Sequence, residues 1–91
     1  MTVETTARIT DPQGLHARPA AQFVQAAGRF GSTIEVEANG QKGNAKSIMG
    51  LLKLGLRMGD SVTIRATGED ADLAASTLAA LLSGGTSEDQ G

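Results

Sequence analysis

The chain has 91 residues, a net charge of −2 and no cysteine, so disulfides and cysteine-ligated metal sites are excluded. A negative net charge gives no positive electrostatic potential that would attract nucleic acid. The single histidine argues against a histidine-based metal site. No apolar run approaches the ~20 residues of a membrane span, and the first residues do not resemble a signal sequence. We therefore expect one small cytoplasmic domain with no cofactor, no metal, and neither a nucleic-acid nor a membrane partner.

The first half of the chain predicts a strand, a helix and a hairpin. Apolar residues alternate with polar ones over 3–9, which is the pattern of a strand with one buried face. Asp11-Pro12-Gln13-Gly14 suits a type I turn, and apolar residues at helical spacing predict a helix over 17–28. Alternation over 33–38, then Asn39-Gly40, predicts a hairpin whose returning strand, 41–45, is a weak edge.

A short helix is predicted to begin after Ser47, a good N-cap residue, and to end near Gly55. It is apolar almost all round, whereas a short surface helix needs only one apolar stripe. We assign Leu51 and Leu54 to the core. This assignment leaves three apolar residues at least partly outward as a docking patch: Ile48, Met49 and Leu52. The alternative is that all five are buried.

The chain ends with a predicted strand over 62–67 and a predicted helix over 70–83, whose acidic start suits the helix dipole. Gly84-Gly85 would stop this helix, so we assign residues 1–85 to one domain and 86–91 to a flexible tail. The order βαββαβα, with polar outer strand faces, predicts an α+β fold in which helices cover one face of a four-stranded antiparallel sheet.

The only histidine, His16, stands just before the first predicted helix, followed by Arg18 and Pro19. A proline fits the first turn of a helix, although the cap could be either His16 or Arg18. A helix start presents unpaired N–H groups and partial positive charge, and that charge favours a neutral imidazole. An anion site beside a nucleophilic nitrogen predicts a phosphoryl-accepting histidine, with Arg18 on the phosphoryl oxygens. The alternative is an ordinary cap histidine with a solvated arginine.

Gly14-Leu15-His16-Ala17-Arg18-Pro19-Ala20 resembles the active-site signature of the HPr family, the histidine-containing phosphocarriers of the bacterial sugar phosphotransferase system. The segments 44–50 and 54–56 resemble the second motif of that family, and the likeness extends from about residue 6 to 82. The resemblance implies an open-faced sandwich with sheet order 1-4-2-3 and three helices on one face. It also implies that Nδ1 of His16 is phosphorylated, a choice that spacing alone leaves open.

The resemblance further implies enzyme I as the donor, charged by phosphoenolpyruvate, and IIA domains of sugar transporters as acceptors. No phosphate-binding Gly-x-x-x-x-Gly-Lys-Ser/Thr loop is present, so we expect a shuttle rather than a complete enzyme. We expect a monomer. The expected partner-binding residues border the histidine or lie on the short helix: Ala17, Ala21, Lys46, Ile48, Met49, Leu52 and Gly55.

Ser47 has two interpretations, which are compatible. It is an N-cap hydroxyl, and by resemblance it is also a regulatory site for HPr kinase/phosphorylase, with a transcriptional regulator as a further partner. Lys46 is expected to be a solvated charge that attracts acidic partners.

Two other classes of function stay open at this point. A regulatory binding protein or nitrogen-type paralogue would use Ser47 as a switch, but the regulatory paralogue of the family lacks the histidine. A non-catalytic interaction domain would make His16 incidental.

Overall fold

The computed structural model describes residues 1–83. Its elements follow the order βαββαβα, as predicted: β1 (Thr2–Arg8), α1 (Ala17–Ala27), β2 (Thr33–Ala38), β3 (Gln41–Asn44), α2 (Ile48–Leu52), β4 (Ser61–Thr67) and α3 (Ala71–Leu82). The short helix is the main difference in extent, because it ends at Leu52 rather than near Gly55. The expected helix stop at Gly84-Gly85 and the expected tail, 86–91, lie outside the described residues.

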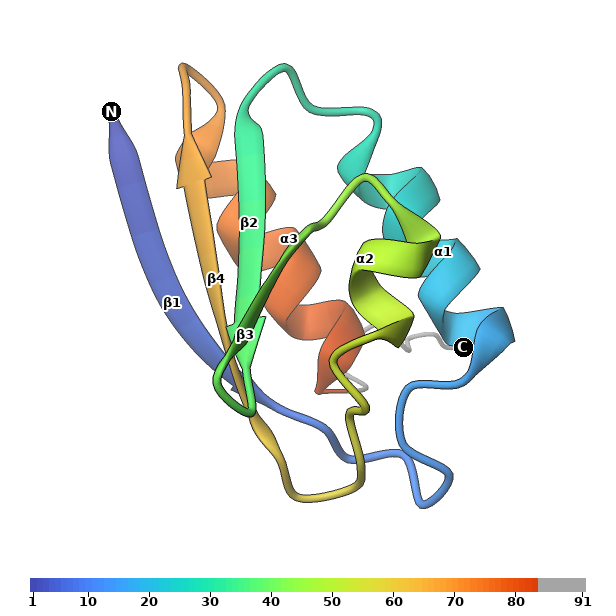
Figure 1. Cartoon of the computed structure of the whole chain (residues 1–91). Helices are drawn as coiled ribbons and strands as arrows, with labels where there is room; N and C mark the ends of the chain where they lie inside the picture. The colour runs from blue at the N-terminus through green and yellow to red at the C-terminus, as the bar shows by residue number, and fades with distance from the viewer. Residues whose placement is uncertain (84–91) are drawn as a thin grey trace.

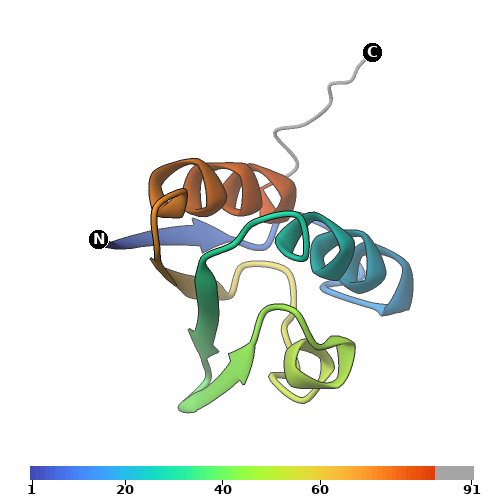
Figure 2. The same ribbon diagram turned by 90° about the horizontal axis from the view of Figure 1, so that it is seen from above.

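The strands form one antiparallel sheet in the order β1-β4-β2-β3, which places β4 and β2 in the middle. All three helices lie on the same face of this sheet (Figures 1 and 2). The α+β open-faced sandwich is therefore confirmed. The turn Asn39-Gly40 joins β2 to β3 with φ values of 53° and 76°, the left-handed pair that a two-residue hairpin loop requires.

The core lies between the helices and the inner face of the sheet. Alternate residues of β2 and β4 are buried, as their sequence pattern predicts: Ile34, Val36, Ala38, Val62, Ile64 and Ala66. Phe23 of α1 is 1% exposed and is the largest fully buried side chain in the described chain. The alanines of α3 that face the sheet are also buried, and small residues allow a helix to approach strands closely.

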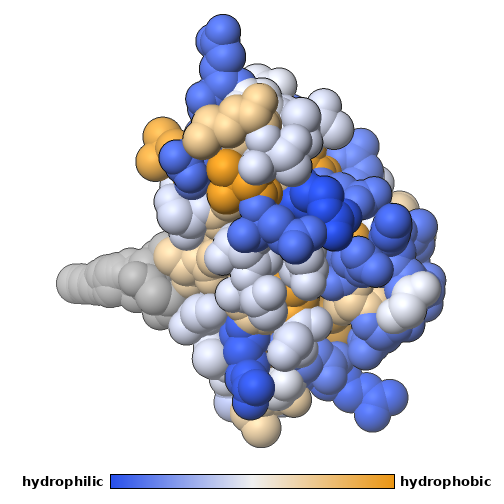
Figure 3. Space-filling model, turned by 90° about the vertical axis from the view of Figure 1, so that its left-hand side faces the viewer, coloured by the Kyte–Doolittle hydropathy of each residue, from blue (hydrophilic) through white to orange (hydrophobic). Residues whose placement is uncertain are grey.

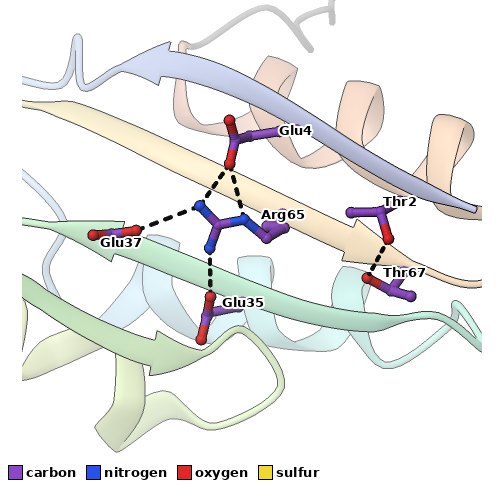
Figure 4. Close-up of polar contacts among 6 residues, drawn as sticks. All are labelled: Thr2, Glu4, Glu35, Glu37, Arg65 and Thr67. Carbon is purple, nitrogen blue, oxygen red and sulfur yellow. Dashed lines mark hydrogen bonds and ion pairs between the residues drawn. The ribbon is translucent and has the colours of Figure 1, made fainter.

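The open face of the sheet carries a cluster of charges centred on Arg65 of β4 (Figure 4). Its guanidinium donates to Glu4 of β1 at 2.5 and 2.8 Å and to Glu35 of β2 at 2.6 Å, with Glu37 at 3.5 Å. The hydrogen bonds to Glu4 and then to Glu35 raise the pKa of Arg65 above its ordinary value. The surface seen from this side is mainly hydrophilic, with smaller apolar areas (Figure 3).

Asp70 occupies the N-cap position of α3, but its side chain does not cap that helix. The carboxylate instead accepts hydrogen bonds from the backbone N–H groups of Gly31 (2.9 Å) and Ser32 (3.0 Å) and from the Ser32 hydroxyl. These bonds, chiefly that of the Ser32 side chain, lower the pKa of Asp70 below its ordinary value. Asp70 therefore holds the loop between α1 and β2, a role that its sequence position did not predict.

No helix within residues 1–83 combines the length and the apolar composition needed to cross a membrane.

Candidate functional site

A tight turn positions His16 at the start of α1. The N–H of Gly14 donates to the carbonyl of Asp11 at 2.8 Å, and that of Gln13 donates to the Asp11 side chain at 2.9 Å. Gly14 has a φ of +73°, and a Cβ there would clash with the carbonyl oxygen of Leu56. Leu15 N–H donates to that same oxygen at 3.2 Å. The loop before His16 is therefore held against the chain that follows α2.

His16 is the N-cap residue of α1, which settles the question between His16 and Arg18. Its φ of −95° and ψ of −172° are extended, its carbonyl accepts from Ala20 N–H at 3.0 Å, and its side chain makes no capping hydrogen bond. The N–H groups of Ala17 and Arg18 donate to no acceptor within residues 1–83, and Pro19 has none to donate. His16 thus directly precedes two amides that have no partner in the described residues, at the positive end of the helix dipole.

Arg18 is exposed, and its guanidinium makes no hydrogen bond or ion pair with any residue in the range 1–83. A guanidinium presents a planar fork of donors that matches phosphate oxygens. Arg18 is therefore available to an incoming anion at the same helix start.

Among the described residues the imidazole of His16 has one acidic neighbour, Asp11, which the sequence pattern indicates only as a turn residue. Its Nε2 lies 3.9 Å from Oδ2 of Asp11, and the two side chains are 42% and 48% exposed. The spacing of five residues does not suggest this contact, because it depends on how the turn folds back.

Ser47 is the N-cap of α2, as predicted, and its Oγ accepts a hydrogen bond from Gly50 N–H at 3.1 Å. The predicted division of this helix is also confirmed, since Leu51 and Leu54 are 1% and 2% exposed. Ile48 and Met49 are 37% and 70% exposed. Leu52 is partly buried. We call Ile48, Met49 and Leu52 the α2 patch.

The helices α1 and α2 lie side by side (Figures 1 and 2) and run in opposite directions. Leu56, after α2, is bonded to the loop before His16, whereas Lys46, before α2, donates through Nζ to the carbonyl of Phe30 at 2.8 Å. Phe30 follows the C-terminal end of α1, a helix of 11 residues or about 16 Å. Ser47 and His16 therefore lie at opposite ends of this helix pair.

The contact with Phe30 corrects the expectation that Lys46 is a solvated charge. The ammonium is bonded to a backbone carbonyl in a partly buried position, and the side chain ties the start of α2 to the loop after α1. The other expected partner-binding residues do reach the surface: Ala17 and Gly55 are exposed and Ala21 is partly exposed. Within residues 1–83 no group of three acidic, histidine or cysteine side chains is placed to hold a metal ion.

Comparison with known proteins agrees with this geometry. The sequence model described as "PTS HPr component phosphorylation site" matches residues 3–84. The chain is 43% identical over 82 residues to a multiphosphoryl transfer protein of Xanthomonas campestris pv. campestris, covering 90% of this chain but only 10% of that protein.

Two solved structures are similar over most of their length. The phosphocarrier protein HPr of Bacillus anthracis superposes with a TM-score of 0.85 at 43% identity, covering 89% of this chain and 96% of that one. Crh, described as a catabolite repression containing protein of Bacillus subtilis and as a dimer with a swapping domain, gives a TM-score of 0.76 at 44% identity, covering 94% and 99%. With the family model matching nearly all of the described residues, this chain belongs to the HPr family of the phosphotransferase system.

Proposed function

We propose that this chain carries a phosphoryl group on His16, accepting it from phosphorylated enzyme I and passing it to a histidine of the IIA domains of sugar transporters. The observation that carries the proposal is the start of α1. There the only histidine of the chain directly precedes Ala17 and Arg18, whose N–H groups, like the Arg18 guanidinium, have no partner within residues 1–83.

The chemistry needs positioning and charge neutralisation more than covalent participation by other side chains. A neutral imidazole nitrogen is the nucleophile that attacks phosphorus in line. The Arg18 fork and the two amides then receive the phosphoryl oxygens. Because the resulting phosphohistidine is an intermediate between two proteins, the chain acts as a carrier and not as an enzyme with its own substrate.

The test is incubation with phosphoenolpyruvate and an enzyme I, followed by intact-mass measurement. We expect one added phosphoryl group that is lost in acid and retained in alkali, and none on His16→Ala. An acid-stable adduct, or full labelling of His16→Ala, contradicts the proposal. Omitting enzyme I is the control that separates carriage from self-phosphorylation.

Ser47 is proposed as a regulatory site for HPr kinase/phosphorylase, with a transcriptional regulator as a further partner of the phosphorylated form. Two observations support it: Ser47 begins the helix that carries the exposed α2 patch, and the chain is similar to Crh. A purely regulatory protein is the second candidate function. It would bind its partner through Ser47 while failing the mass test on His16.

The proposed carrier acts as a cytoplasmic monomer. Because the similar protein Crh is described as a dimer, the oligomeric state is a prediction to be measured directly. Light scattering during size-exclusion chromatography gives the molar mass in solution, for which we expect a single chain at all concentrations tested.

A further inference from the structure

Within residues 1–83 the imidazole of His16 has one charged contact, with Asp11, and the proposed function does not use it. Oδ2 of Asp11 lies 3.9 Å from Nε2, at the side of the ring that does not carry Nδ1. A hydrogen bond between such atoms has a typical length of ~2.9 Å. Both side chains are exposed at the surface, so rotation of either one can shorten this distance.

The carboxylate of Asp11 is oriented by the backbone of its own turn. Its Oδ1 accepts the Gln13 N–H at 2.9 Å, while its carbonyl accepts the Gly14 N–H at 2.8 Å. With one carboxylate oxygen held by the turn, the other is the one presented to the ring. The turn that delivers His16 to the surface thus also aims an acceptor at one of its nitrogens.

A neutral imidazole carries its proton on one nitrogen only, and the partner of the ring selects which. An ionised carboxylate can only accept a hydrogen bond, so it favours the form protonated at Nε2. That form leaves the lone pair on Nδ1. We infer that Asp11 is a positioning residue that keeps the proton on Nε2 of His16 and so reserves Nδ1 for the phosphoryl group. The inference rests on the proposed phosphoryl transfer to His16.

The transfer step balances with this assignment. The Nδ1 lone pair forms the N–P bond while the bond from phosphorus to a nitrogen of the donor, a phosphorylated protein histidine, breaks, and its electron pair stays with the donor. His16 keeps its Nε2 proton throughout, so its ring gains positive charge. The Asp11 carboxylate beside Nε2–H stabilises that charge more strongly as it develops than in the free protein.

Two variants separate this role from the turn itself. In Asp11→Asn the side-chain oxygen can still accept the Gln13 N–H, which turns an amide N–H₂ donor towards Nε2 and favours the opposite proton position. In Asp11→Ser the hydroxyl can also hold the turn but presents nothing to the ring. Asp72→Asn is the matched control, because it removes the same charge from an exposed position on α3.

The primary measurement is the ¹⁵N spectrum of the His16 ring in the free protein, at a pH where the ring is neutral. The chain has one histidine, so both nitrogen signals are unambiguous. We expect Nε2–H to predominate in the wild type and in Asp72→Asn. Contacts between exposed charges contribute little free energy. We therefore expect the population ratio of the Nε2–H form to the Nδ1–H form to fall about threefold in Asp11→Ser and up to about tenfold in Asp11→Asn. Transfer from phospho-enzyme I should slow in the same order, by about two- to tenfold, with thermal melts unchanged.

The outcomes keep the two proposals apart. A wild type that is mainly Nδ1–H overturns the inference whatever the variants do. An unchanged proton position in the variants, or a changed position with unchanged transfer, also overturns it while leaving phosphorylation of His16 intact. If the wild type is not phosphorylated at all, the proposed function fails, whatever the proton position.

Discussion

Arg18 and Arg65 have the same side chain but differ in their partners. The difference distinguishes the start of α1 from the open face of the sheet. Arg65, on the open face of the sheet, is bonded to Glu4 and Glu35 from the two neighbouring strands. Arg18, at the start of α1, has no partner within residues 1–83, and neither do the two amides beside it. Arg65 is thus already paired with side chains of its own sheet, whereas Arg18 at the start of α1 is available to a ligand.

The largest expected effect is on phosphoryl transfer in Arg18→Lys. Lysine keeps the charge but loses the planar fork, and loss of a charge-assisted contact of ~1.5–3 kcal/mol slows transfer roughly ten- to a hundredfold. Rapid-quench kinetics with phospho-enzyme I measure the rate. Arg29→Lys, an exposed position after the same helix, is the control and should transfer normally. Equal rates for wild type and Arg18→Lys would show that guanidinium geometry is irrelevant.

Phosphorylation of Ser47 is expected to inhibit charging of His16 from a distance. The two residues lie at opposite ends of the α1–α2 pair, so the phosphate is not expected to act on His16 directly. Instead we expect it to weaken the binding of a partner protein to the α2 patch. A desolvation and repulsion penalty of ~1.5–3 kcal/mol corresponds to roughly ten- to a hundredfold weaker coupling.

The fold itself should not suffer, because a dianion at a helix N-terminus is favourable. The measurements are the charging rate and the thermal melt of the unmodified, phosphorylated and Ser47→Asp forms. Ser47→Asp should reproduce only part of the effect, as it has less charge and fewer acceptor oxygens. If the phosphorylated form is charged at the normal rate, Ser47 is a cap and not a switch.

Met49→Asp tests whether the α2 patch binds partner proteins. Met49 is 70% exposed, so folding should be nearly unchanged, while binding to both enzyme I and a IIA domain weakens about tenfold. Calorimetry gives the affinities. Leu73→Asp is the matched control, because Leu73 is 61% exposed on α3. An unfolded Met49→Asp would place this residue in the core instead.

Arg65→Met should show the reverse behaviour, with a small loss of stability and unchanged transfer. The cross-strand pairs with Glu4 and Glu35 are part-exposed, and such pairs contribute little, so we expect the melting temperature to fall by about 2–5 °C. Slower phosphoryl transfer in this variant would show that the open face of the sheet also contributes to transfer.

The smallest expected effect is the pH dependence that Asp70 contributes. Its pKa is lowered in the folded chain, mainly by the Ser32 hydroxyl, so the folded state binds its proton less readily than the unfolded state. Its contribution to stability is complete above the ordinary carboxyl pKa of 3.8 and is lost as the pH falls through the lowered value. Urea melts across that range should show a shallower acid loss in Asp70→Asn than in the wild type. An identical acid loss would mean that the contact with Ser32 is not formed in solution.

Local patterns were sufficient to predict the order of the elements and the placement of His16 and Ser47 at helix starts. Alternation and helical spacing predict most strands and helices, because burial of one face imposes those periods on neighbouring residues. The turn Asn39-Gly40 and the cap residue Ser47 predict the remaining strand and the short helix. The stretch from His16 to Pro19 predicts an anion site because a helix start creates one locally. Ser47 was predicted as a cap for the same reason, and its bond to Gly50 spans three residues.

Only the tertiary structure decided the contacts between distant parts of the chain. Asp70 accepts hydrogen bonds from Ser32, 38 residues away, although its sequence position suits a helix dipole. Lys46 donates to the carbonyl of Phe30, 16 residues away, although its sequence position suggests a solvated charge. The contact between Asp11 and His16 depends on how the turn before α1 folds back. The separation of His16 from Ser47 depends on how α1 and α2 pack together. The strand order β1-β4-β2-β3 followed from family resemblance and not from pattern. The physical reason is the same in each case: periodicity and capping act over a few residues, whereas partners across a sheet or between helices are chosen by the packing of the whole core.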